Sequence, residues 1–126
     1  CFGLKMHIIE PCGFNLNDSR FKRVIMDYIN QNSIIRYESF KDLLNKNKKS
    51  RVILMSTKAE KSLFKFKFKK TDIILFGRES KGVPEYMHKE IKNKLKIPIS
   101  SKTRSLNVAT SASITAAEAL RQTKIF

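Results

Sequence analysis

The stretch DIILFGRESKGVP, residues 72–84, combines a strand, a loop and the start of a helix. Its DIILF segment carries a continuous apolar run, the pattern of a parallel strand that is covered on both faces. Gly77 then offers backbone angles that are closed to other residues, and Pro84 suits the first turn of a helix. The stretch therefore predicts the strand–loop–helix unit of which α/β proteins are built.

The same alternation continues on both sides of this stretch. Residues 51–55 (RVILM) form a second apolar run, and Asp18 and Ser39 are plausible helix N-caps. Further strands are expected at residues 5–9, 33–37 and 95–99, and Pro98 should mark the end of the last one or an irregularity in it. Further helices are expected at 19–29, after Ser39 and at 106–123. The pattern predicts one α/β domain, residues 1–126, with a mainly parallel sheet flanked by helices.

The chain is strongly basic, with 26 Lys and Arg against 11 Asp and Glu, a net charge of +15 and a sequence pI near 10.1. Such an excess favours a polyanionic partner, most commonly nucleic acid, although a lysine-rich surface without a ligand has the same composition. No apolar run approaches the length of a membrane span, and no secretory leader is visible. The two cysteines make no disulfide framework, which favours a reducing cytoplasm.

Metal and hydrolytic chemistry find little support in the sequence. Cys1 and Cys12 lack the spacing of metal ligands, and His7 and His88 each stand alone without an evident orienting partner. No Ser-His-Asp or Cys-His arrangement can be identified. We therefore expect neither a metal site nor an acyl-transfer hydrolase.

The first candidate ligand-binding segment is LFGRESKGVP, residues 75–84. Loops at the carboxyl ends of parallel strands are where α/β proteins bind ligands. Gly77 would let a ligand approach the backbone, and Glu79 could accept hydrogen bonds from hydroxyls or an amine. The Gly-Lys-Ser/Thr ending of a phosphate-binding P-loop is absent, and an ordinary strand-to-helix turn has the same spacing.

The second candidate is IPISSKTRSLN, residues 97–107, which is polar and leads into the last helix. Ser105 is expected to cap that helix, whose free N–H groups would receive a carboxylate or phosphate next to the cation Arg104. A solvated connection with a good N-cap explains the same residues.

The third candidate, residues 61–70 (KSLFKFKFKK), alternates phenylalanine with lysine, so an extended conformation would separate apolar and cationic faces. Lysines on phosphates and rings on bases would make it a nucleic-acid contact. A half-buried edge strand with solvated lysines is the alternative, and we expect the phenylalanines to be buried. Arg20, Lys22 and Arg23 form another basic group, near a helix N-terminus whose dipole they oppose.

Three stretches, in this order, resemble the SpoU-type branch of the SPOUT RNA methyltransferases, most closely the small tRNA 2′-O-methyltransferases that modify the wobble nucleoside. They are HIIEPCGF at residues 7–14, LFGRESKGVP at 75–84 and IPISSKTRSLNVATSAS at 97–113, and the resemblance spans essentially the whole chain. It implies an α/β fold with a C-terminal deep trefoil knot, a homodimer, S-adenosylmethionine as methyl donor, and transfer to a ribose 2′-hydroxyl of RNA.

The resemblance also implies roles for individual residues. Ser105 and Asn107 would order the reactive end of the site. RNA contacts are expected from Arg20, Lys22, Arg23 and Arg104. The donor would be held by Met55, Gly77, Glu79, Ile97, Ile99, Ser105 and Leu106.

Two departures from the family pattern bear on activity. The family begins with a strand and an Asn-rich loop ending in an arginine that helps to activate the ribose hydroxyl. That segment would lie before Cys1, so the domain is expected to lack its first strand and helix. Ala117 stands before Glu118 where the family has tyrosine. A catalytically impaired RNA-binding protein on the same scaffold is the alternative function, whereas another doubly wound nucleotide-binding domain would need the missing G-x-G-x-x-G signature.

Overall fold

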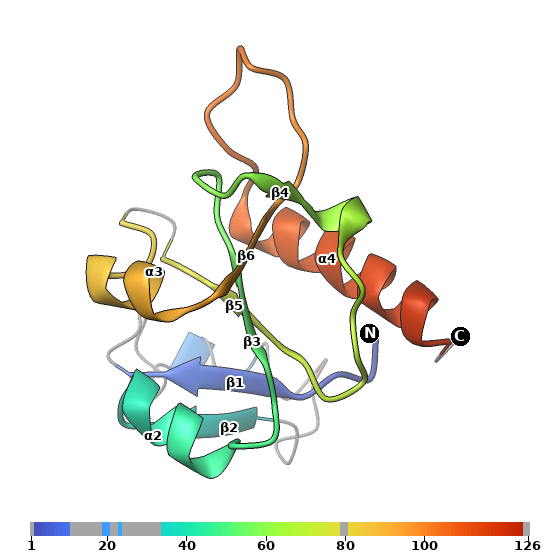
Figure 1. Cartoon of the computed structure of the whole chain (residues 1–126). Helices are drawn as coiled ribbons and strands as arrows, with labels where there is room; N and C mark the ends of the chain where they lie inside the picture. Colours follow the sequence, from blue (N-terminus) through green and yellow to red (C-terminus); the bar gives the residue numbers. More distant parts are fainter. Residues whose placement is uncertain (1, 11–18, 21–22, 24–33, 79–80, 125–126) are drawn as a thin grey trace. The chain divides into compact units, whose positions relative to one another are not determined.

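The computed structural model describes residues 2–10, 19–20, 23, 34–78 and 81–124 (Figure 1). The chain divides into two compact units, residues 1–48 and 49–126. Of the helix expected at residues 19–29, Ser19, Arg20 and Arg23 are helical. The rest of that helix and its expected cap, Asp18, lie outside the described residues.

In the first unit, β1 (Met6–Ile9) pairs in parallel with β2 (Ile34–Tyr37). The helix α2 (Phe40–Lys46) follows, and the Ser39 hydroxyl caps it by accepting the Asp42 N–H at 3.1 Å. Both strands and the Ser39 cap confirm the sequence prediction. Among the described residues of this unit, the buried apolar side chains are Ile8, Tyr37, Phe40 and Leu43.

The Tyr37 hydroxyl joins β1, β2 and the end of α2. His7 Nδ1 lies 3.0 Å from it, and Asn47 Nδ2 donates to it at 3.1 Å and to the Leu43 carbonyl at 2.8 Å. The His7 and Tyr37 rings stack with centroids 5.5 Å apart. Burial lowers the pKa of His7, and the charge of nearby Lys5 lowers it further. The expectation that His7 lacks an orienting partner is therefore wrong.

In the second unit, four parallel strands form one sheet in the order β4-β6-β3-β5. They are β3 (Val52–Met55), β4 (Lys61–Ser62), β5 (Ile73–Phe76) and β6 (Asn93–Lys96). Met55 stands opposite Phe76 on one side and Leu95 on the other, so β3, β5 and β6 end at nearly the same level. The prediction of a parallel sheet is confirmed, and its three longer strands point their carboxyl ends to one edge.

The described residues of this unit also form the α-helices α3 (Glu85–Glu90), which follows Pro84, and α4 (Val108–Thr123). Ile114 and Ala119 of α4 pack against the core beside the sheet. This core cluster of buried side chains contains Ile53, Leu63, Phe66, Phe68 and Leu95. Between β6 and α4, residues 97–107 form a long loop that projects from the sheet in Figure 1.

Two predicted boundaries are wrong. The strand expected at residues 95–99 spans Asn93–Lys96 instead, although its end before Pro98, which has no N–H for the ladder, agrees with the expected effect of that proline. The last helix begins at Val108, and its N-cap is Asn107, not Ser105. Asn107 Oδ1 accepts the N–H groups of Ala109 at 2.8 Å and Thr110 at 3.4 Å, so the amide side chain takes the capping role.

Residues 61–70 do not form one extended strand. After β4, residues Leu63–Lys65 turn through a short 3-10 helix, η2. This turn leaves Phe64 57% exposed, while Phe66 and Phe68 return to the core at 6% and 8%. Burial of the phenylalanines is confirmed for the last two and wrong for Phe64.

Candidate functional site

A cavity of about 530 Å³ opens at the carboxyl ends of β3, β5 and β6. Its walls come from the three segments that follow these strands, together with His88 of α3 and the first turn of α4. The volume lies within the usual range of small-molecule sites, and the position is the one at which parallel sheets bind ligands.

The apolar part of the wall is built mainly by the segment that follows β6. Ile97, Ile99 and Leu106 line the cavity with Met55 at the end of β3. Ile99 and Leu106 each remain 37% exposed, so part of their apolar surface is not covered by the described residues. These side chains offer a surface on which a flat apolar group could be buried.

The segment after β5 is closed by backbone contacts around Gly77. Gly82 N–H donates to the Arg78 carbonyl at 2.8 Å, and Arg78 N–H donates to the Gly82 carbonyl at 3.3 Å. A Cβ on Gly77 would lie 2.5 Å from the Gly82 carbonyl carbon and 2.6 Å from Val83 N. Gly82 has a φ of +63°, whereas Gly77 lies outside the left-handed region. Gly77 is thus required by close backbone packing, and the expected unusual backbone angles are wrong.

His88 connects α3 to the segment after β3. Its Nε2 lies 3.0 Å from the Ser56 hydroxyl, and both residues line the cavity. The same hydroxyl accepts the Lys58 N–H at 3.2 Å, and Ser56 N–H donates to the Leu95 carbonyl at 2.9 Å. These bonds fix the cavity wall formed by residues 56–58. The expectation that His88 lacks an orienting partner is also wrong.

The described cavity lining is positively charged. Lys58, Arg78 and Lys81 contribute to it, and no Asp or Glu occurs among the lining residues that the structure describes. Cations around an apolar pocket favour a ligand that carries a carboxylate or phosphate as well as an apolar body.

The cavity brings together most of the donor-site residues expected from sequence. Ser105 and Asn107, expected at the reactive end, lie in the same wall, next to the start of α4. The expected residues that line the cavity are Met55, Gly77, Ile97, Ile99, Ser105, Leu106 and Asn107.

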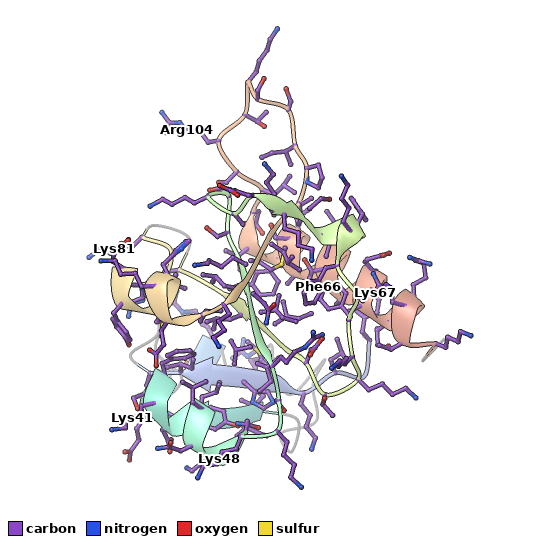
Figure 2. All side chains as sticks on the ribbon, in the orientation of Figure 1. Lys41, Lys48, Phe66, Lys67, Lys81 and Arg104 are labelled. Atoms are coloured by element: carbon purple, nitrogen blue, oxygen red, sulfur yellow. The ribbon has the colours of Figure 1, made fainter. Side chains whose placement is uncertain are left out.

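The remaining expected residues lie elsewhere. Glu79 and Lys22 fall outside the described residues. Arg20 and Arg23 are exposed on helical residues of the first unit. Arg104 is exposed on the loop 97–107 and, in Figure 2, points away from the chain.

Sequence reasoning missed several lining residues. Ser56 and Lys58 directly follow a predicted strand, so the rule that placed Gly77 at a strand end could have found them. His88 carries no such signal, because its approach to Ser56 joins residues 32 positions apart.

Neither a metal site nor a membrane span emerges from the described part of the chain. No group of three or more His, Cys, Asp and Glu residues there could hold a metal ion. None of its helices is long and apolar enough to cross a membrane.

Comparison with known proteins places this geometry in a family. The SpoU rRNA Methylase family model matches residues 1–117. A tRNA (cytidine(34)-2′-O)-methyltransferase from Ancylobacter novellus is 41% identical over 98% of this chain and 79% of its own length. The enzyme of the same name from Beijerinckia indica is 42% identical over 97% of this chain and 78% of its own length. A solved structure described as "Structural insights into the 2-OH methylation of C/U34 on tRNA" superposes with a TM-score of 0.84 at 35% identity, covering 94% of this chain and 78% of that one.

Proposed function

Because the chain belongs to the SpoU rRNA methylase family, we propose that it transfers a methyl group from S-adenosylmethionine to the ribose 2′-hydroxyl of nucleotide 34 of tRNA. The observation that carries this proposal is the cavity at the carboxyl ends of β3, β5 and β6. The names of the relatives supply the substrate, since they act on cytidine 34 of tRNA.

The chemistry of the cavity fits the methyl donor. S-Adenosylmethionine has a flat adenine, an amino-acid carboxylate and a sulfonium-bound methyl group, which it supplies as an electrophile. Ile99 and Leu106, both partly exposed at the wall, would bury the adenine. Lys58 and Lys81 would receive the carboxylate, because they add positive charge to a lining whose described residues include no acid. Glu79 would accept hydrogen bonds from the donor's hydroxyls or amine.

Ser105 and Asn107 would position the acceptor ribose. The side-chain oxygen of Asn107, Oδ1, accepts the capping hydrogen bonds of α4. Asn107 therefore fixes the start of the helix next to Leu106 and Ser105. The Ser105 hydroxyl has no protein partner among the described residues and lies in the cavity wall, where it can bond to a ribose hydroxyl. Arg104, beside it, would contact an RNA phosphate, as would the basic group at residues 20–23.

Finer features belong to the same proposal. The two compact units would together make a single methyltransferase domain, residues 1–126. Its C-terminal part would be tied in a deep trefoil knot, supported by the long loop 97–107 that precedes α4. The chain would act as a homodimer in the cytoplasm, where its tRNA substrate resides. A crystal structure tests the knot, and sedimentation velocity tests the dimer.

Transfer of radiolabelled methyl groups tests the reaction. The protein is incubated with labelled S-adenosylmethionine and a tRNA transcript, and the labelled nucleotide is located by nuclease mapping. The matched substrate carries a 2′-deoxyribose at nucleotide 34 alone. We expect label at nucleotide 34 of the normal transcript and none in the deoxy transcript. Equal labelling of both would overturn the assigned acceptor, and no transfer to either would favour an RNA-binding protein without catalysis.

A further inference from the structure

Residues 61–70, here called the basic ridge, contain five lysines and no acidic residue. We propose that the basic ridge binds single-stranded RNA, with Lys65, Lys67 and Lys69 on phosphates and the Phe64 ring stacked on an unpaired base. This inference rests on the proposed function, since it concerns how the same chain holds its RNA.

The ridge backbone is fixed by α4. Gln122 donates from Nε2 to the Phe66 carbonyl at 2.9 Å, and its Oε1 accepts the Phe68 N–H at 2.9 Å. The two phenylalanine rings meet edge to face with centroids 5.0 Å apart. Figure 2 shows Phe66 and Lys67 on the stretch beside α4. With both rings anchored in the core, the intervening Lys67 remains exposed.

The sheet fixes the ridge from its other end. Arg51, just before β3, donates from Nη2 to the Lys67 carbonyl at 3.0 Å. Asp72, just before β5, accepts the Lys69 N–H at 2.7 Å. A backbone held in this way presents its lysines in a set arrangement, which lowers the conformational entropy lost on binding a strand of phosphates.

Two carboxylates lie next to the ridge, and each is already paired with an arginine. Asp72 accepts a backbone N–H of the ridge, and Glu118 accepts a hydrogen bond from Gln122, which holds the ridge backbone. Arg51 donates to both Asp72 oxygens, at 2.8 and 2.7 Å. Arg121 donates to both Glu118 oxygens, each at 2.8 Å, and with Gln122 lowers the pKa of Glu118 to about 2. Among the described residues, no ion pair joins a ridge lysine to an acid. The charges of Lys65, Lys67 and Lys69 are therefore left for an external anion, whereas Lys61 Nζ lies over the Phe66 ring, 5.2 Å from its centroid.

Phe64 distinguishes the ridge from a simple lysine patch. The η2 turn exposes 57% of this residue, between Lys61 and Lys65. An exposed ring among cations is the arrangement with which proteins bind single strands, since every base can stack on it. A second copy of this chain would bring the same positive charge, so electrostatics opposes self-association through the ridge.

The ridge begins next to the segment that builds the cavity. Lys61 stands opposite Leu95 and Ser62 opposite Lys96 in the parallel β4–β6 pair. Ile97, the residue that directly follows β6, lines the cavity. RNA bound to the ridge can therefore lie on the same unit as the site of transfer.

The test compares two triple variants of equal charge. The ridge variant carries Lys65→Gln, Lys67→Gln and Lys69→Gln, and the control carries the same change at Lys41, Lys48 and Lys49, which are also exposed. Binding of a fluorescent single-stranded RNA is measured between 50 and 200 mM salt. Three lost phosphate contacts should reduce the salt slope by about 2 and weaken binding at low salt by about tenfold or more, against a markedly smaller effect in the control. Equal effects of the two variants on RNA binding would overturn the proposal that the ridge binds RNA.

Phe64→Ala tests the stacking. Single-stranded RNA should bind about fivefold or more weakly, duplex RNA should bind as before, and Phe64→Tyr should behave as the wild type. Equal losses for single strands and duplex would overturn the role of the ring. Binding of polyglutamate with the same dependence on the three lysines and Phe64 would overturn the assignment to RNA.

The affinity for S-adenosylhomocysteine and methyl transfer to tRNA, measured on the same variants, separate this inference from the proposed function. We expect the ridge variant to keep its S-adenosylhomocysteine affinity. RNA binding through the ridge without methyl transfer would leave the ridge standing and overturn the function. Methyl transfer by the wild type, together with unchanged RNA binding in the ridge variant, would support the proposed function and overturn the role of the ridge.

Discussion

The two units of the chain differ in their net charge and in the partners of their polar groups. Residues 1–48 carry eight Lys and Arg against five Asp and Glu, whereas residues 49–126 carry eighteen against six. In the first unit, His7, Tyr37 and Asn47 form a cluster of hydrogen bonds with one another. In the second, arginines hold Asp72 and Glu118 while lysines face the cavity and the solvent. The excess of positive charge is thus concentrated in the unit that holds the cavity, which is where a polyanionic substrate would use it.

The ion pairs of the two units should show the largest contrast in stability. The Asp72 side chain is only 2% exposed, so Arg51→Met would leave a buried carboxylate without its charged partner and lower the free energy of unfolding by about 3 kcal/mol. In the first unit, the side chains of Arg36 and Glu10 are 50% and 37% exposed, so Arg36→Met should lower it by less than about 1 kcal/mol. Urea denaturation measures both, and losses of equal size would contradict the contrast.

Two glycine substitutions should separate binding from stability. Gly77→Ala places a Cβ against the Gly82–Val83 backbone, so we expect displacement of that cavity wall and a loss of about tenfold or more in S-adenosylhomocysteine affinity. Gly3, in the first unit, has a φ of +69° and open space around it. Gly3→Ala should therefore lower stability by about 1 kcal/mol and leave that affinity unchanged. Calorimetric titration measures the affinities, and an unchanged affinity in Gly77→Ala would show that the wall tolerates the shift.

The two histidines should differ in what their loss affects. Ser56→Ala and His88→Leu each remove the bond that fixes residues 56–58, so each should weaken S-adenosylhomocysteine binding by about two- to tenfold. The double variant should lose no more than Ser56→Ala alone, because that single variant already lacks the bond to His88. His7→Leu should instead lower stability by about 1 kcal/mol without changing the affinity. Additive losses at Ser56 and His88 would show that their hydrogen bond does not position the wall.

The pH dependence of unfolding should show a smaller difference. Burial lowers the pKa of His7 in the folded state, so the unfolded chain binds the proton more readily. The contribution of neutral His7 is present above pH 6.5, its ordinary pKa, and is lost as the pH falls below that value. Unfolding curves at several pH values should show this loss in the wild type and a flatter profile in His7→Gln. An unaltered profile would assign the dependence to other groups.

Glu118 should affect the free energy of unfolding at lower pH than His7 does. Its pKa is lowered to about 2 by Arg121 and Gln122, so its contribution is present above its ordinary pKa of 4.5 and is lost as the pH falls toward 2. Glu118→Gln should remove that part of the acid sensitivity. An acid transition of the same steepness in the variant would contradict this contribution.

Local sequence signals located the elements well where one residue or one run decides the structure. The apolar runs RVILM and DIILF became β3 and β5, and Ser39 caps α2, because burial on both faces and a capping hydroxyl are properties of a few adjacent residues. The boundaries of β6 and α4 were predicted less accurately: β6 begins two residues earlier than expected and α4 two residues later. Asn107 caps α4 in place of Ser105, and β6 ends before Pro98.

The candidate site was predictable to the extent that it follows strand ends. Gly77 and the segment 97–107 were found because they come directly after predicted strands, and a parallel sheet brings such segments together. The partners of His7 and His88 were not found, because each hydrogen bond joins residues at least 30 positions apart. The sequence also did not show why residue 77 is glycine, because the backbone that leaves no room for a Cβ there belongs to Gly82 and Val83.

The sequence by itself determined the α/β class, the basic character and the family, because these depend on apolar periodicity, composition and the order of short motifs. Only the tertiary structure decided which phenylalanine of residues 61–70 faces solvent and which carboxylates are neutralised. The η2 turn exposes Phe64, and the clamps from Gln122, Arg51 and Asp72 fix the lysines beyond it. Side chains distant in sequence set these outcomes, and local alternation carries no information about such partners.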